Sequence, residues 1–386
     1  MADQLAVRGY RKSAQSGTTT ISATIGDFEV WFRAPDLDHS PERGDPFLAV
    51  ALLPAMYAGV ELDLLALPPV SERLLASLDA IQEVWTTWNP ALRHVAIRAH
   101  VAPVESPRTT RTGTFFSGGV DAMHAALAGG GSNEHLVFVN GFDFAMSGPE
   151  FLAASQRVER AAAKLGGELS LVETNWIAFT RHHRISRPAS HGGCLVAVAH
   201  LLAPARMTIA SSNSWLRNTP WGTHNLLDPL WSSDLTTIRH FGSDALRAEK
   251  VALIATRPEL LDDLWVCHEN PVENCGQCTK CSRTMAVLSV IGASGRGFAD
   301  AGGDPVERYL RAVPLSWENV YLSELRQTVV ACGNDQALLR RIDATGRALD
   351  RRAALRELRN LLMRPRPRDR DVVDLRPWGF GPVPEA

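Results

Sequence analysis

Four of the six cysteines fall within one short stretch of the 386-residue chain: Cys267, Cys275, Cys278 and Cys281. The two-residue gaps between the last three allow successive thiolates to turn back onto one tetrahedral ion, and intracellular clusters of this kind bind metal more often than they form disulfides. Four thiolates leave no open coordination position, which predicts a structural Zn²⁺ site. An iron–sulfur cluster, which would colour the protein brown, and a redox-active Cys-x-x-Cys pair are the alternatives.

A second stretch, TGTFFSGGVDAMHAAL at residues 112–127, has the residue types of an anion-binding turn. The glycines at 118 and 119 let the backbone curl into a nest of N–H groups, and the Ser117 hydroxyl can donate to a phosphate oxygen. Asp121 would repel a bare phosphate, so we expect it to hold a Mg²⁺ ion that bridges the phosphate oxygens. The alternative is a glycine turn that serves tight packing, with Asp121 as a helix-start residue.

The elements around this turn alternate between strand and helix, which predicts an open parallel α/β sheet covered on both faces. Strands are expected at 112–116, 135–141, 168–176 and 205–212, and helices at 122–129, 149–166 and 192–202. Ligands bind beyond the carboxyl ends of such strands, where the first strand-to-helix turn lies. The turn is not a Walker A loop, and no Gly-x-Gly-x-x-Gly follows a predicted strand, so the sequence favours neither a kinase-like protein nor a dehydrogenase.

The flanking regions differ in pattern, so we expect three parts: an N-terminal α+β module at 1–105, the nucleotide-binding sheet at 106–298 and a helical region with an irregular tail at 299–386. In the first part, strands are predicted at 18–34, 46–53 and 94–101, with core strands over 47–70, and a helix at 71–88. In the last part, helices are predicted at 305–313, 318–332 and 335–363. Cys194 and Cys332, outside the four-cysteine stretch, are expected to be small core residues.

The composition is that of an ordinary globular protein, with 45% hydrophobic and 21% charged residues and a net charge of −2. Such a charge lacks the basic excess typical of nucleic-acid binders, so no nucleic-acid partner is expected. The most apolar window is broken by prolines and acids, which argues against a membrane span. No apolar segment follows the basic residues of the N-terminus, which argues against a secretory signal. We therefore expect a cytoplasmic protein.

Residues 117–121 resemble the PP-loop of the ATP pyrophosphatases, whose pattern is Ser-Gly-Gly-x-Asp-Ser, with Ala122 in place of the final Ser. The turn followed by the four-cysteine run is similar to the 7-cyano-7-deazaguanine synthase family over roughly residues 110–296. Arg283 matches the family's arginine after the last cysteine, and a loose counterpart at 228–255 points to Lys250 and Arg247. The family's Tyr-Pro-x-Cys-Arg segment is missing, and SSNSWLRNTPWGTHN stands in its approximate place.

The resemblance implies an adenine nucleotide alpha hydrolase (HUP-like) fold and an ATP-dependent ligase. Such an enzyme adenylates a carboxylate or amide, releases pyrophosphate, and lets ammonia or an amine displace AMP. The implied ligands are ATP, Mg²⁺, Zn²⁺ and a small carboxylic acid, for which a deazaguanine is one candidate. The pyrophosphate would be bound by Ser117, Gly118, Gly119 and Val120, the Mg²⁺ by Asp121, and the remaining charge would be offset by Lys250 and Arg283.

Two other functions stay open. One is thiolation of a tRNA or a metabolite, which predicts a sulfur-relay cysteine outside the zinc set. The other is an ATP-binding protein that recognises a protein partner without turnover, in which Ala122 marks the lost chemistry.

Three polar features have both a functional and a structural interpretation. Asn140 and Asp143 follow a strand and could contact the nucleotide, although Asn-Gly is also a common turn. Residues 340–370 hold eleven arginines against four acids, which we interpret as a solvated helix face rather than a surface for RNA or an acidic protein. A basic loop could meet an anionic substrate at Arg181, His182, His183, Arg184, Arg187 and His191.

Overall fold

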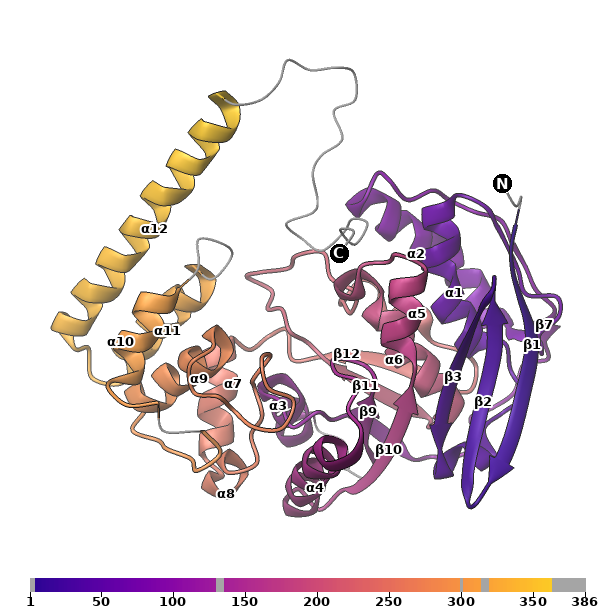
Figure 1. Ribbon diagram of the computed structural model, residues 1–386, viewed down its shortest axis with the longest axis horizontal. Helices are drawn as coiled ribbons and strands as arrows, with labels where there is room; N and C mark the ends of the chain where they lie inside the picture. The colour runs from indigo at the N-terminus through magenta and orange to yellow at the C-terminus, as the bar shows by residue number, and fades with distance from the viewer. Residues whose placement is uncertain (1–3, 130–134, 299–300, 314–318, 363–386) are drawn as a thin grey trace.

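The computed structural model describes residues 4–129, 135–298, 301–313 and 319–362, and it is an α/β protein with a large, mostly parallel central sheet (Figure 1). Ten strands of the described residues form this sheet, in the order β12-β11-β8-β9-β10-β3-β2-β1-β4-β6. The first five are parallel to one another: β12 (Thr237–Phe241), β11 (Arg206–Ala210), β8 (Thr112–Phe115), β9 (His135–Asn140) and β10 (Glu168–Thr174).

The order of the parallel strands creates a switch point beside β8. The chain runs from β8 outward to β9 and β10 on one side, and then returns to place β11 and β12 on the other side. Connections that leave β8 and β11 in opposite directions open a crevice at the carboxyl ends of these two strands, and such crevices are where open α/β sheets bind ligands. The strands and helices expected over 112–212 are confirmed, whereas β12 was not predicted from the sequence.

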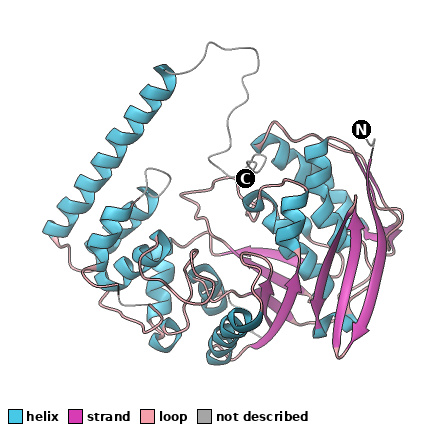
Figure 2. Ribbon diagram, in the orientation of Figure 1, coloured by secondary structure: helices cyan, strands magenta, loops and turns pink. Residues whose placement is uncertain are grey.

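Alternate residues of the strands feed two separate cores. In β9, Leu136 and Phe138 pack into one core while Val137 packs into the other, as the two-residue period of a strand requires. Helices pack on both faces of the sheet (Figure 2). One face is covered by α1 (Asp45–Ala58), α5 (Trp176–His182) and α6 (Arg187–Leu202), and the opposite face by α3 (Val120–Ala128) and α4 (Gly148–Lys164). Helix α7 (Arg247–Ala255) packs on α3, and α9 (Thr279–Val290) packs on α7.

The N-terminal strands continue the same sheet. A meander of β1 (Gln4–Gln15), β2 (Thr18–Ile25) and β3 (Phe28–Ala34) joins it where β3 pairs antiparallel with β10. Beyond β1 lie β4 (Glu61–Asp63) and β6 (Ile97–Arg98), and β5 (Val70–Ser71) pairs separately with β7 (Val101–Ala102). Hydrogen bonding is therefore continuous across the boundary expected near residue 105. The strand structure predicted over 18–34 is confirmed as β2 and β3, but the strand expected at 94–101 is reduced to two short pieces.

The strand predicted at 46–53 is wrong, because α1 occupies Asp45–Ala58 and stays helical through Pro54. Every residue from Asp45 to Met56 is buried, so the run is apolar on all sides of the helix and has no period that separates a helix from a strand. Close approach to α6 explains this burial, since a Cβ at Gly193 would lie 2.5 Å from the Ala49 carbonyl oxygen. The following helix α2 (Glu72–Trp88) agrees with the prediction at 71–88.

The helices after α8 (Pro258–Leu261) and α9 form the C-terminal region. They are α10 (Pro305–Ala312), α11 (Asn319–Ala331) and α12 (Gln336–Leu362), and α12 extends away from the body of the molecule (Figure 1). The helical prediction is confirmed here, and the arginines of α12 up to Arg359 are exposed, while the tail lies outside the described residues. Cys194 is buried as expected, but Cys332 follows α11 at the surface and is not a core residue.

Within the described residues, none of the helices combines the length and the apolar character that crossing a bilayer requires.

Candidate functional site

The Ser117–Asp121 turn joins β8 to α3 at the switch point of the sheet. Gly118 has a φ of +75°, in the left-handed region that favours glycine, and its carbonyl oxygen accepts a 2.9 Å hydrogen bond from the Trp265 N–H. The Gly119 N–H donates to the exposed Ser117 Oγ at 3.3 Å, and Gly119 is the N-cap residue of α3. The backbone therefore curls at the positive end of a helix, which is the arrangement that binds anions.

Two cations converge on Asp121 in the first turn of α3. Lys250 Nζ lies 3.0 Å from Oδ1 and Arg247 Nη1 lies 3.1 Å from Oδ2, and both cations come from the first turn of α7. Lys250 is only 2% exposed and also donates to the Ser211 carbonyl oxygen at 2.6 Å. Burial alone would raise the pKa of Asp121, but Lys250 and Arg247 outweigh it and lower the pKa to about 2. Asp121 is therefore a fixed negative charge at neutral pH.

Arg283 lies on α9, near Arg247, and does not line the cavity described below. Its Cζ atom is 3.6 Å from the centre of the Tyr321 ring, and the residue is buried. It borders a small internal void together with Arg247. Arg283 can therefore influence Asp121 through the local field, while Arg247 stands closer to any bound ligand.

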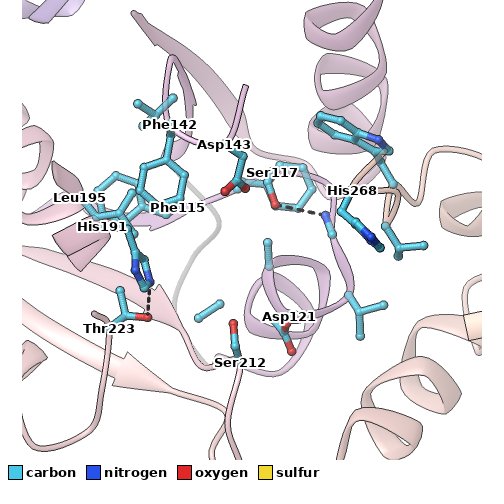
Figure 3. Close-up of a pocket in the computed structure, with 18 of the residues that line it drawn as sticks. Phe115, Ser117, Asp121, Phe142, Asp143, His191, Leu195, Ser212, Thr223 and His268 are labelled. Carbon is cyan, nitrogen blue, oxygen red and sulfur yellow. Dashed lines mark hydrogen bonds between the residues drawn. The ribbon is translucent and has the colours of Figure 1, made fainter. Parts of the chain in front are cut away.

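A cavity of about 500 Å³ opens at the carboxyl ends of β8, β9 and β11 (Figure 3). Ser117, Gly119, Val120 and Asp121 of the turn form part of its wall. Its other polar lining residues are Asp143, Arg187, His191, Ser212, Thr223, Arg247, His268 and Lys280. Aromatic side chains line it too: Phe115, Phe116, Phe138, Phe142, Phe144, Trp221 and Trp265. The volume lies in the range of small-molecule and cofactor sites.

The cavity has chemically different sides. Phe142, His191 and Leu195 gather on one side in Figure 3, and His268 lies on the other, with Ser117 and Asp121 between them. Planar apolar walls next to a glycine turn at the start of a helix suit a ligand that joins a ring to phosphates.

The remaining polar residues named from the sequence fall into two groups. Asp143 lines the cavity, but Asn140 braces its own turn by donating to the Met146 carbonyl oxygen at 2.9 Å and accepting from the Met146 N–H at 3.0 Å. Of the basic loop, Arg187 and His191 line the cavity, whereas His182 pairs with Asp27 at 2.6 Å at the N-terminal hairpin. The expected loop is largely helical, since α5 and α6 occupy most of it.

His191 is held rigidly in the cavity wall. Its Nδ1 is 2.9 Å from the Pro188 carbonyl oxygen and its Nε2 is 3.1 Å from Thr223 Oγ1, so Nδ1 donates and Nε2 accepts from the hydroxyl. Burial lowers its pKa, which keeps the ring neutral near pH 7.

The loop of residues 211–226 closes the cavity against α6 through glycines. A Cβ at Gly192 would lie 1.9 Å from the Gly222 carbonyl oxygen, and one at Gly222 would lie 2.5 Å from His191 Nδ1. This approach places Trp221 and Thr223 in the wall. The sequence showed only that the family segment was missing here, because loop-to-helix contacts of this kind leave no local pattern.

We expect Gly192→Ala to destabilise the protein by about 1–3 kcal/mol, because the added methyl group must push the 211–226 loop from α6. Displacing Trp221 should also weaken the binding of any ligand that the cavity holds. Denaturant unfolding and isothermal titration measure the two effects. Gly346→Ala is the matched control, since its Cβ would meet only Leu322 Cδ2 at 3.8 Å and the substitution in α12 is expected to be neutral or slightly stabilising. Equal behaviour of the two variants would contradict the packing argument.

The four cysteines meet at one point, with their Sγ atoms within 4.8 Å of one another. Cys278 is the N-cap residue of α9, and backbone N–H groups of Asn270, Cys278 and Cys281 point at the sulfurs of Cys267, Cys275 and Cys278. This cysteine cluster can hold a metal ion such as zinc, because four converging sulfurs with N–H donors behind them match the donor set of a closed structural site.

Asn274 organises the loop that carries the cluster. It is 2% exposed, and its Oδ1 accepts from the N–H groups of Val266 and Cys267 at 2.8 and 3.1 Å. Its Nδ2 donates to the carbonyl oxygens of Leu264 and Gly297, both at 2.7 Å. Sequence reasoning missed this residue, although an asparagine directly before a metal-binding cysteine is a signal worth testing.

The cluster and the turn are parts of one structure. Trp265 donates to Gly118 and lines the cavity, and Val266, Cys267, His268 and Lys280 continue the same wall. Asp263, beside them, accepts from Arg160 Nε at 3.0 Å and Lys164 Nζ at 2.6 Å on α4. The segment that leads into the cluster is thereby fixed both to α4 and to the Ser117–Asp121 turn.

Comparison with models of protein families, with characterised proteins and with solved structures finds no match for this chain.

Proposed function

We propose that the chain is a PP-loop ligase that uses ATP to adenylate a carboxylate or amide, releases pyrophosphate, and forms a C–N bond when ammonia or an amine displaces AMP. The observation that carries this proposal is the convergence at the switch point. A glycine turn at the start of α3 holds Asp121 with Arg247 and Lys250, and it borders a cavity of about 500 Å³ with aromatic walls.

The chain's residues have separable tasks in this chemistry. The Ser117 hydroxyl and the Val120 N–H at the start of α3 would bind the departing pyrophosphate, and Arg247 supplies positive charge at the cavity wall. Trp221, Phe142 and Trp265 enclose the reactants and exclude water, which strengthens these electrostatic contacts. Arg187 and Lys280 offer further cations to an anionic substrate.

The bond changes balance without a further reactant. A carboxylate oxygen attacks the α-phosphorus, and the bond from this phosphorus to the bridging oxygen breaks as pyrophosphate leaves. The nitrogen nucleophile then attacks the acyl carbon, the C–O bond to AMP breaks, and the nitrogen gives up a proton to solvent.

Two carboxylates, Asp121 and Asp143, are available at the cavity for Mg²⁺, which normally binds through one or two carboxylates and substrate phosphates. When bound, Mg²⁺ would neutralise charge on the pyrophosphate. Asp121 must then share or release one of its two cations, and Arg247, which lines the cavity, is the one placed to meet the phosphates.

The cysteines speak against the thiolation alternative. A relay requires a thiol at the reaction cavity, but Cys194 is buried in α6 and Cys332 lies after α11, and neither lines the cavity. Cys267 does line it, but as a member of the cysteine cluster.

Oxygen tracing tests the proposal most directly. The protein is incubated with Mg-ATP, ammonium and an acid labelled with ¹⁸O in its carboxylate, starting with 7-carboxy-7-deazaguanine and continuing with fractionated cell metabolites. Adenylation transfers one heavy oxygen to AMP, which mass spectrometry detects. AMP without label would indicate simple hydrolysis, and ATP binding without AMP from any acid would favour the partner-recognition function instead.

A further inference from the structure

The C-terminal helix α11 packs against the helix that carries Arg247 and Lys250, the two cations that contact Asp121. α11 packs on both α7 and α9, and the three helices lie together on the side of the molecule opposite the N-terminal strands (Figure 1). The side chains of Tyr321, Leu322, Glu324 and Leu325 are buried in this contact. Helix α11 is therefore a packed part of the site's support.

Glu324 contacts the first turn of α7 directly. Its Oε2 accepts from the Ala248 N–H at 3.1 Å, and Glu324 is only 6% exposed. The first N–H groups of a helix have no partner within the helix, and a carboxylate there is favoured by the helix dipole as well. Ala248 is the neighbour of Arg247, so this hydrogen bond fixes the backbone from which the cation projects.

The charges around Glu324 agree with this role. Burial raises the pKa of Glu324 above its usual value, and the Ala248 N–H, Arg247 and Arg283 offset part of that rise by favouring the charged carboxylate. Tyr321, one helical turn earlier, lies under Arg283 and also faces Arg217 of the 211–226 loop, whose Cζ is 5.3 Å from the ring centre. Helix α11 thus contacts three separate segments, α7, α9 and the 211–226 loop.

We propose that Glu324 is a positioning residue that sets the first turn of α7 so that Arg247 and Lys250 meet Asp121 and Arg247 meets the phosphates of ATP. This inference rests on the proposed function for the identity of the ligand. The C-terminal region lies outside the family resemblance. Through Glu324 it would nevertheless act on the site, which lies on the other side of α7.

A double-mutant cycle on Mg-ATP affinity tests the proposal. We expect Glu324→Leu to weaken binding by about tenfold and Arg247→Met by about a hundredfold, while the double variant is no weaker than Arg247→Met alone. Glu324→Gln, which keeps an acceptor for Ala248, should restore affinity to within about threefold of the wild type. Fold changes that multiply in the double variant, or wild-type affinity in Glu324→Leu, would overturn the positioning role.

Glu249→Gln is the matched control, because the exposed Glu249 accepts from the Leu246 N–H at 2.7 Å at the same helix start without contacting α11. Its effect on affinity should stay within about twofold and should multiply with that of Arg247→Met.

A second measurement separates this inference from the proposed function. Hydrogen exchange of the α7 amides should accelerate about tenfold in Glu324→Leu relative to Glu324→Gln, with or without nucleotide. A wild-type chain that binds no ATP would remove the proposed function, and faster exchange would still establish that Glu324 positions α7. Unchanged exchange in Glu324→Leu would overturn the inference even if the chain forms AMP.

Discussion

Asp121→Asn is expected to reduce AMP formation from Mg-ATP by at least about a thousandfold, because catalysis by phosphoryl-transfer sites depends on fixed charges around the phosphates. Asparagine keeps the shape of the side chain but removes the charge that holds Lys250 Nζ at 3.0 Å and Arg247 Nη1 at 3.1 Å. The two cations would then repel each other and leave their positions. Quantification of AMP and pyrophosphate release measures the effect.

The same substitution should also lower stability, since removing one partner of a buried ion pair costs about 3–5 kcal/mol. Asp121 is 20% exposed at its side chain and Lys250 only 2%, so solvent can compensate the lysine poorly. Activity must therefore be compared at a temperature at which circular dichroism shows both proteins folded. Folded Asp121→Asn protein with wild-type turnover would refute the site.

Glu168→Gln provides the control for charge removal. Glu168 is the first residue of β10 and pairs with Arg111 at 2.5 Å. The pair lies at the amino ends of the parallel strands, away from the cavity at their carboxyl ends, and both side chains are exposed. Surface pairs of this kind contribute about 0–1 kcal/mol, so this variant should keep its activity and its unfolding midpoint. A similar loss in both variants would mean that the effect of Asp121→Asn is not local.

The sequence predicted the parts of this protein whose signal is local. The strand before Ser117, the helix after it and the amphipathic helices at 71–88 and 149–166 follow from periodicity, because one face of each element meets a core. The four cysteines were found by spacing alone. The four sulfurs converge within 4.8 Å, with the last three cysteines brought together by two-residue gaps around the helix start at Thr279 and Cys267 held near them by Asn274.

Prediction failed where burial or pairing depends on distant segments. The run at 46–53 is buried on all sides, so its helix α1 is selected by packing against α6 and the sheet rather than by its own pattern. β12 lies at the sheet edge, and its residues TIRHF mix polar and apolar types. Likewise, Glu324 accepts a hydrogen bond from a backbone N–H 76 residues away, and Asn274 bonds to backbone groups 7 to 23 residues away. Composition and spacing do not encode such contacts.

The cysteine cluster carries the other large expected effect. Purified protein should contain about one zinc per chain, and Cys278→Ser should lose that metal and unfold at a temperature at least about 10 °C lower, because structural zinc sites supply several kcal/mol of folding free energy. Elemental analysis identifies the metal. Iron in a brown protein would favour an iron–sulfur cluster over a zinc site.

Metal loss should reach the nucleotide as well. Trp265 donates to the Gly118 carbonyl oxygen, and Val266 and Cys267 line the cavity, so disorder in the segment before the cluster removes both a wall and a support of the anion-binding turn. We therefore expect Cys278→Ser to bind Mg-ATP at least about tenfold more weakly in titrations below its unfolding temperature. Cys332→Ser, at an exposed cysteine outside the cluster, should match the wild type in metal content, stability and affinity. Metal-free protein that keeps its unfolding midpoint and its ATP affinity would show that the cluster supports neither the fold nor the turn.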